Sequence, residues 1–155
     1  MSTRWTGTDE EVQALDAFIK LMRAANAVFE RAHRHLAEEN VSTSQFAVLE
    51  ALHHLGPLRS CDLARKILIP KSASNLTLVL DNLEKRDLIQ RRRDADDRRS
   101  VQISLTPSGE TLIGEMLPRH VRGIVREFHQ LTPGERDELA RLCRLVGEPR
   151  NDTKE

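Results

Sequence analysis

The stretch that decides the fold runs from Leu58 to Leu105 and reads LRSCDLARKILIPKSASNLTLVLDNLEKRDLIQRRRDADDRRSVQISL. It predicts a short helix, a turn, a longer helix and then two short strands joined by a charged tip. The longer helix carries one apolar stripe at helical spacing, made up of Leu76, Val79, Leu80 and Leu83. At about 100° per residue, the residues that point away from the core are then Ser74, Leu78, Asp81 and Lys85.

Two strands are predicted, at residues 88–92 and 101–105. In the second strand, Ile103 and Leu105 alternate with polar residues, as expected of a half-solvated strand. The connecting sequence RRRDADDRRS is too charged to be buried. A helix able to enter a groove, followed by a basic hairpin, is typical of a winged helix-turn-helix. The expected fold class is therefore mainly α with a small antiparallel β-hairpin wing.

Amphipathic helices are predicted on the N-terminal side of this module. A capping box of Thr8 and Glu11 opens a helix that should run to about residue 39. A second capping box begins the next helix at Ser42, and Ser60 is predicted to cap the third.

Two further helices are predicted on the C-terminal side. Thr106-Pro107 and Thr132-Pro133 each combine a capping residue with proline at the first helical position. The expected organisation is one domain at 8–147, with a winged module at about 42–105, dimerisation helices at about 8–39 and 106–147, and flexible tails at 1–7 and 148–155.

Length and charge bound the possible functions. A chain of 155 residues suits a single core. Net charge is zero, yet residues 59–100 hold 11 Lys and Arg against 7 Asp and Glu. Such a basic segment favours contact with phosphates, although charge that only covers solvated helices is the alternative. An apolar run near 18 residues and a signal-peptide pattern are both missing, so a cytoplasmic protein without membrane association is expected.

The chain contains the segments STSQFAVLEALHHLGPLRSCDLARKI, LDNLEKRDLIQRRRDADDRRSVQISLTPSGETL and LTPGERDELARL. The second segment joins a DxRR wing to an LTPxG helix start, which is a specific combination. Together they resemble the MarR family of bacterial transcription regulators over roughly residues 10–147. The resemblance implies a DNA-binding regulator, usually a repressor, that forms an obligate homodimer through its terminal helices. A monomer whose terminal helices cap the module is the alternative.

The outer face of the longer helix is then expected to lie in the major groove of double-stranded DNA. Asn75 is placed to pair with adenine, while Ser74 and Thr77 are placed to reach bases or phosphates. Lys71 and Ser72 lie near the helix N-terminus, where backbone N–H groups and the helix dipole favour a phosphate.

Three positions depart from the family pattern. The family commonly has Arg at the positions of Leu78 and Asn82. An outward Leu78 indicates contact with a thymine methyl group and hence A·T pairs in the operator. Packing of Leu78 against a neighbouring helix is an equally weighted alternative. At Asp87 the family usually has Gly, because a left-handed residue ends the helix there, and Asp adopts that conformation less readily.

The wing supplies the second part of DNA recognition. Arg99 is expected to enter the minor groove, with Asp97 on the same side of the strand to hold its guanidinium, as in the wing-tip pair of the family. Arg98 and the run Arg91 to Arg93 would add salt-dependent attraction, although a merely solvated ribbon is the alternative for that run. Two recognition helices related by a dyad predict a pseudo-palindromic operator.

A regulator also needs an effector. Members of the family often bind phenolic or aromatic carboxylate ligands where the dimerisation helices meet the winged module. The candidate residues for such a ligand are Arg23, Phe29, His33, Phe46 and Glu50. Ordinary core packing is the alternative for the two phenylalanines. The segments LVLDNLEKRDLIQRRR and GEMLPRH also resemble a subgroup that responds to quinones or similar electrophiles.

Other functions are less well supported by the sequence. Cys61 follows the presumed cap Ser60, where a helix N-terminus lowers the pKa of a thiol, so a redox switch is an alternative. No cofactor or metal is expected, because histidine pairs at i, i+4 and zinc-site cysteine pairs are missing. An enzyme is not expected, since the chain has no phosphate-cradling glycine loop, nucleophile elbow or HExxH motif. A winged module that binds a protein partner would instead need an acidic or apolar outer face.

Overall fold

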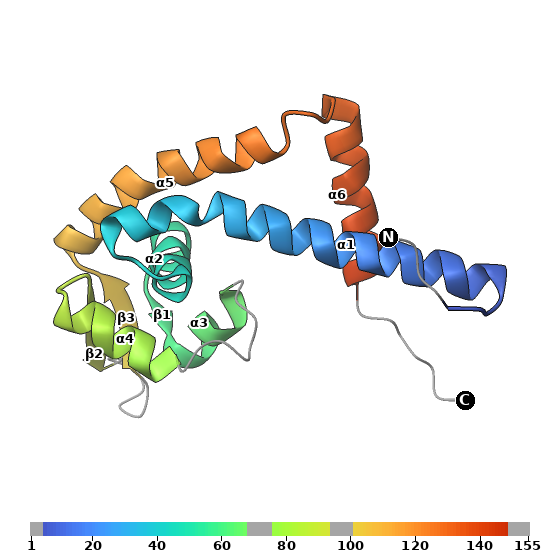
Figure 1. Ribbon diagram of the computed structural model, residues 1–155. Helices are drawn as coiled ribbons and strands as arrows, with labels where there is room; N and C mark the ends of the chain where they lie inside the picture. The colour runs from blue at the N-terminus through green and yellow to red at the C-terminus, as the bar shows by residue number, and fades with distance from the viewer. Residues whose placement is uncertain (1–4, 68–75, 94–100, 149–155) are drawn as a thin grey trace, which may run out of the picture.

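The computed structural model describes residues 5–67, 76–93 and 101–148. The fold class agrees with the prediction: a winged helix-turn-helix flanked by long terminal helices (Figure 1). The elements are α1 (Asp9–Ala32), the 3₁₀ helix η1 (Arg34–Glu39), α2 (Thr43–Leu55), β1 (Leu58–Arg59), α3 (Ser60–Lys66), α4 (Leu76–Lys85), β2 (Ile89–Arg93), β3 (Val101–Leu105), α5 (Pro107–Glu127) and α6 (Pro133–Gly147).

One hydrophobic core holds the winged module together. It joins α2, α3, α4 and the sheet to the first half of α5. The largest side chains with less than 2% exposure include Phe46, Leu49, Leu63, Leu83 and Ile103. Truncating a buried Leu or Phe of this kind to Ala lowers the free energy of unfolding by about 2–5 kcal/mol. These contacts therefore hold α4 in a fixed position on the winged module.

The sheet has three strands rather than the predicted two. Its order is β1-β3-β2, with both pairings antiparallel. Ile103 of β3 lies opposite Leu58 on one side and Arg91 on the other. The strand β1 was missed because two residues after a Gly-Pro turn are too few to show an alternating pattern. It anchors the start of α3 to the wing.

The first helix is shorter than predicted. α1 ends at Ala32, and the chain continues as the 3₁₀ helix η1, which ends at Asn40 in a left-handed conformation with φ 52°. The prediction of one helix to residue 39 was wrong. It rested on the apolar spacing that includes Leu36, and Leu36 is buried in η1 just as it would be in a continuous α-helix. Over one or two turns, 3.6- and 3.0-residue periods give the same apolar spacing.

Helix starts agree with the prediction in four of five cases. Capping boxes are formed by Thr8 with Glu11, Ser42 with Gln45 and Thr132 with Glu135, and Thr106 caps α5 through the backbone N–H of Gly109. The exception is α3. Its N-cap is Arg59, which makes no capping side-chain hydrogen bond, and Ser60 is already helical. Because β1 runs directly into α3, no separate capping turn precedes Ser60.

The end of α4 agrees with the prediction made for Asp87. This residue has φ 55°, the left-handed conformation that glycine adopts at low cost. Its carbonyl oxygen accepts a hydrogen bond of 2.5 Å from the hydroxyl of Thr106. The turn after α4 is therefore tied to the start of α5.

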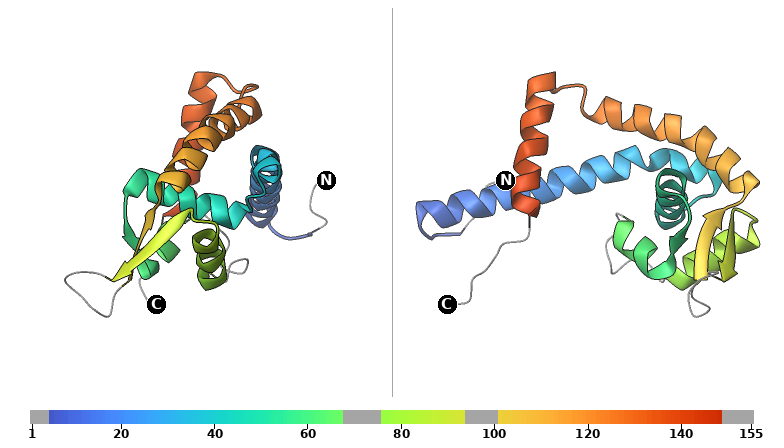
Figure 2. Two further views of the ribbon diagram at one scale, coloured as in Figure 1. Left: turned by 90° about the vertical axis from the view of Figure 1, so that its left-hand side faces the viewer. Right: turned by 180° about the vertical axis from the view of Figure 1, so that it is seen from behind.

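The terminal helices leave a large apolar surface uncovered. The N-terminal half of α1 and all of α6 extend away from the winged module (Figures 1 and 2). α6 has no buried residue. The exposed apolar side chains of the three terminal helices are Phe18, Leu21, Met22, Phe29, Val121, Ile124, Val125, Leu139, Leu142, Leu145 and Val146. Within one chain, these helices bury too little to explain their own amphipathic patterns.

Candidate nucleic-acid interface

The outer face of α4 is open to solvent, as its apolar spacing predicts. Leu80 and Leu83 are buried, whereas Thr77 is exposed and Leu78 is 57% exposed. Packing of Leu78 into a neighbouring helix would have buried it. Leu78 and Thr77 therefore share the exposed side of α4, and their contact with DNA stays a prediction.

The ribbon of β2 and β3 lies against α4 through Arg91. Its guanidinium forms ion pairs with Asp81 at 2.7 Å and with Glu84 at 3.2 Å, both on α4. These carboxylates leave Arg91 less free to neutralise a DNA phosphate. Arg91 holds β2 at a fixed position relative to α4, and its contact with DNA stays a prediction.

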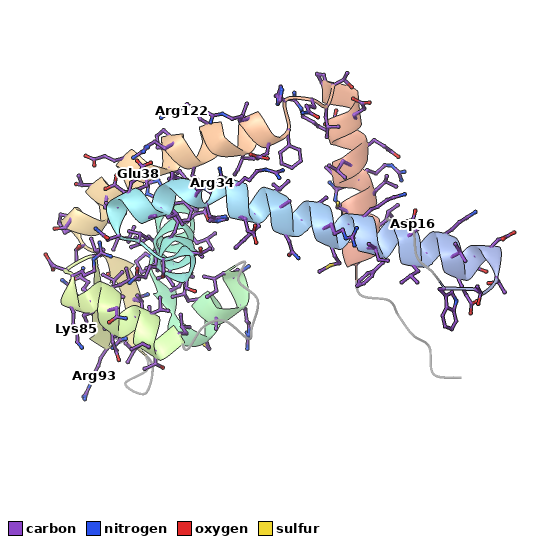
Figure 3. The ribbon with its side chains drawn as sticks, in the orientation of Figure 1. Asp16, Arg34, Glu38, Lys85, Arg93 and Arg122 are labelled. Carbon is purple, nitrogen blue, oxygen red and sulfur yellow. The ribbon has the colours of Figure 1, made fainter. Side chains whose placement is uncertain are left out.

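Arg92 and Arg93 carry the open positive charge of the ribbon. Both are exposed, and Arg92 donates a hydrogen bond of 3.2 Å to the Gln90 side chain. Figure 3 shows Arg93 and Lys85 at the same end of the molecule, projecting from the ribbon and from α4. The described residues thus place two elements with accessible cations side by side.

Seven predicted DNA-binding residues lie outside the described residues. They are Lys71, Ser72, Ser74 and Asn75 before α4, and Asp97, Arg98 and Arg99 in the wing. Their roles stay predictions. The first group precedes the start of α4 at Leu76, and the second lies between the end of β2 at Arg93 and the start of β3 at Val101.

Three of the five candidate ligand residues come together where α1, α2 and α5 meet. The rings of Phe29 and His33 have centroids 4.2 Å apart, and His33 and Phe46 lie edge to face at 6.1 Å. Phe46 is 1% exposed and belongs to the core. Arg23 is ten residues before His33 on α1, or about 15 Å along a helix axis, so it does not join them. Glu50 is partly buried, one turn after Phe46 on α2.

His120, which was not predicted from the sequence, completes this aromatic–histidine cluster. His120 is 5% exposed, and its ring centroid lies 4.6 Å from Phe46 and 4.8 Å from His33. Burial, together with the neighbouring His33 and His35, lowers the pKa of His120 to about 4. His120 is therefore neutral at physiological pH. No sequence signal marked it, because its ring partners are more than 70 residues away in the sequence.

Comparisons with known proteins agree with this geometry. The MarR family model matches residues 41–101. The HTH-type transcriptional regulator YkoM of Bacillus subtilis is 32% identical over 145 residues, which cover 93% of each chain. The chain belongs to the MarR family.

Two other relatives support membership of the MarR family. The transcriptional repressor MprA of Escherichia coli is 28% identical over 131 residues, covering 81% of this chain and 71% of MprA. The structure of BpsR from Bordetella bronchiseptica superposes with a TM-score of 0.74 at 28% identity, covering 84% of this chain and 91% of BpsR. That protein's DNA binding is regulated by 6-hydroxynicotinic acid. As a MarR-family member, the chain is a DNA-binding transcription regulator and not an enzyme.

The MarR fold places the redox candidate Cys61 on the surface. Cys61 is exposed in the first turn of α3, and Cys143 is exposed on α6. Among the described residues, no group of three or more His, Cys, Asp or Glu side chains has the arrangement of a metal site. In the same part of the chain, every helix is too short or too polar to span a membrane.

Proposed function

We propose that the chain is a homodimeric repressor that binds a pseudo-palindromic operator through α4 and the wing and is released by a small ligand. The observation that carries this proposal is the solvent-facing side of α4, where Leu78 and Thr77 lie open beside an arginine-bearing ribbon. A recognition helix needs such a face, and the adjacent ribbon supplies cations for the phosphates.

The homodimer is supported by the uncovered apolar faces of α1, α5 and α6. Apolar area removed from water contributes about 25 cal/mol per Å², so helices this amphipathic gain stability from a second copy. A two-fold dimer would hold two α4 helices about one DNA turn apart.

The operator preference follows from Leu78. An apolar side chain on the groove-facing side favours a thymine methyl group, so each half-site should contain an A·T pair at that step. Leu78→Arg should move the preference towards G·C, because Arg pairs with the acceptors of guanine. Selection of preferred sites from a random DNA pool, with wild type and variant in parallel, measures this. An unchanged preference would remove the methyl contact from the proposal.

The test of the function is binding to genomic fragments from around the gene of this protein, repeated over a salt series. Tight binding to one fragment, weakened by Arg99→Ala but not by Lys20→Ala, is the expected result. Lys20 is an exposed cation on α1, paired with Asp16, and serves as the matched control. Binding without preference among fragments would contradict regulation through an operator.

The ligand response is supported by the aromatic–histidine cluster at the junction of α1, α2 and α5. Phe29, His33 and His120 place one phenyl ring and two imidazole rings where a phenolic or aromatic carboxylate compound could be enclosed. A ligand wedged there would change the angle between the dimerisation helices and the winged module. Screening such compounds for release of the operator fragment tests this.

Two alternatives are separated by the same assay. The exposure of Cys61 favours a thiol switch as the second candidate, and operator release by peroxide that is lost in Cys61→Ser would establish it. An absence of any DNA binding at low salt would favour a protein-interaction module. In that case Leu78 would be part of an apolar docking face.

A further inference from the structure

A second concave site lies where α1 and η1 meet α5. Its volume is about 440 Å³, within the range of small-molecule sites. Five arginines line it, contributed by α1, η1 and α5: Arg31, Arg34, Arg119, Arg122 and Arg126. Two carboxylates, those of Glu38 and Glu127, line it as well. The lining therefore has a large excess of positive charge, in a chain whose net charge is zero.

Two of the five arginines are already paired. Arg31 binds Glu127 at 2.5 Å, and Arg119 binds Glu38 and, at 3.1 Å, Glu39. These pairs tie α1 and η1 to α5.

The other three arginines are Arg34, Arg122 and Arg126, and none has a carboxylate partner among residues 5–67, 76–93 and 101–148. Three guanidinium groups around one concavity repel each other unless an anion lies between them. Arginine also presents paired N–H donors that match the oxygens of carboxylates and phosphates.

The arginine side of α5 is turned away from most of the exposed apolar residues of that helix. At about 100° per residue along α5, Arg119, Arg122 and Arg126 fall within about 60° of one another. Val121 and Ile124 lie about 100° or more from each of them, whereas Val125 borders Arg122 at about 60°. A second subunit that covers Val121 and Ile124 would therefore leave Arg119 and Arg126 accessible.

The arginine pocket is also remote from the nucleic-acid interface. Figure 3 shows Arg34, Glu38 and Arg122 around the junction of α1 and α5, whereas Lys85 and Arg93 lie at the opposite end of the winged module. DNA held by α4 and the ribbon would therefore not neutralise these arginines. A separate anion is needed.

We infer that the arginine pocket binds a small organic oxyanion carrying at least two negative charges, of the phosphate-ester or polycarboxylate class. Arg122 and Arg126 hold its charged groups from α5, and Arg34 closes the pocket from η1. The existing pairs of Arg31 and Arg119 keep the two sides at a fixed separation. This inference stands on the pocket alone and does not depend on the operator or on the effector of the aromatic–histidine cluster.

The experiment is calorimetric titration of the full chain with pyrophosphate and, separately, with citrate at physiological ionic strength. Saturable binding of at least one is expected, and the tighter of the two identifies the class of charged group. The double variant Arg122→Gln/Arg126→Gln should weaken that binding by about tenfold or more, because charge-assisted hydrogen bonds are lost. Circular dichroism checks that the variant is folded.

The matched control is Arg136→Gln/Arg144→Gln, which removes the same charge from exposed residues of α6. This variant should bind the anion as the wild type does. Equal loss in both double variants would show general attraction to positive charge and overturn the inference. So would an absence of saturable binding, or loss of DNA affinity as the only effect of the pocket variant, which would make the arginines a nucleic-acid contact.

Discussion

His120 is a buried histidine surrounded by other histidines. Its ring centroid lies 4.8 Å from that of His33 and 5.4 Å from that of His35. Within the described part of the chain, its buried Nδ1 atom has no hydrogen-bond partner. Burial and these neighbouring rings all oppose a positive charge on His120. The junction of α1, α2 and α5 is therefore built around a neutral imidazole.

This neutrality predicts loss of stability in acid. The pKa of His120 is lowered to about 4, against 6.5 without the protein environment. The unfolded chain therefore takes up the proton first, so stability is full above about pH 6.5 and falls as the pH drops towards 4. From this residue alone, the free energy of unfolding should decrease by up to about 1.4 kcal/mol per pH unit. Urea unfolding at a series of pH values measures this slope.

The control for this prediction is a second histidine on the same stretch of chain. His120→Phe should flatten the slope between pH 6.5 and 4, whereas His129→Phe should not, because His129 is exposed. Equal slopes in the two variants would assign the acid sensitivity to other groups.

Asp87 predicts a stabilising substitution. Its φ of 55° costs a residue with a side chain about 1–2 kcal/mol, and glycine avoids most of that cost. Asp87→Gly should therefore raise the free energy of unfolding by about 1 kcal/mol, with an unchanged denaturant slope. Glu115→Gly, an acid-to-glycine change inside α5, should lower it by about 1 kcal/mol. A loss of stability in both variants would contradict the conformational explanation.

At the scale of single residues, local rules predicted well and long-range ones did not. The outward position of Leu78 follows from helical spacing, and the left-handed backbone of Asp87 follows from its place at the end of a helix. His120 joins a cluster through contacts with residues distant in sequence. Nothing in its own neighbourhood distinguishes it from an ordinary helical histidine.

At the scale of elements, α4 and the wing form one unit because Arg91 pairs with Asp81 and Glu84. The sequence suggested that Arg91 contacts phosphate, but the pairing of a strand residue with two helix residues depends on how β2 lies against α4. Helix starts were predictable because capping involves residues three apart. The strand β1 and the change from α1 to η1 were not, because pairing with β3 and burial of Leu36 decide them.

The salt dependence of operator binding should separate the two arginines of the ribbon. Arg93→Ala should reduce the slope of log affinity against log salt by about 0.9, as expected for one lost phosphate contact. Arg91→Ala should lower affinity with little change of slope, because it loosens the wing rather than removing a phosphate contact. The slopes are measured by fluorescence anisotropy with one operator fragment. Equal reductions would place Arg91 on the phosphate backbone as well.

At the scale of the whole molecule, the terminal helices look incomplete in a single chain. α1 packs against α5, yet the apolar side chains of all three terminal helices stay exposed, Val146 by 72%. An amphipathic helix in water is marginal unless its apolar face is covered. The sequence indicated this through the length and pattern of these helices. Which side chains face the second copy depends on how the helices pack.

In the proposed homodimer, disrupting this face should separate the protomers. Val125 is 58% exposed on α5, and Val125→Asp would bury an unpaired charge in the dimer. We expect the dissociation constant of the dimer to rise by at least about tenfold, measured by sedimentation equilibrium. Gln13→Asp adds the same charge to α1, on the side opposite its apolar stripe, and should leave the dimer intact. Dimers of equal strength in both variants would contradict this interface.

The unpacked state of α6 has a consequence for the turnover of this regulator. A newly synthesised protomer carries a helix with no buried residue, which opens far more easily than a packed one. Proteases cut the backbone where it opens. Degradation should therefore act mainly on protomers that have not met a second copy. The cellular lifetime of the regulator would then lengthen as its own concentration rises. At a low rate of synthesis, most of the protein would be degraded before it forms a dimer.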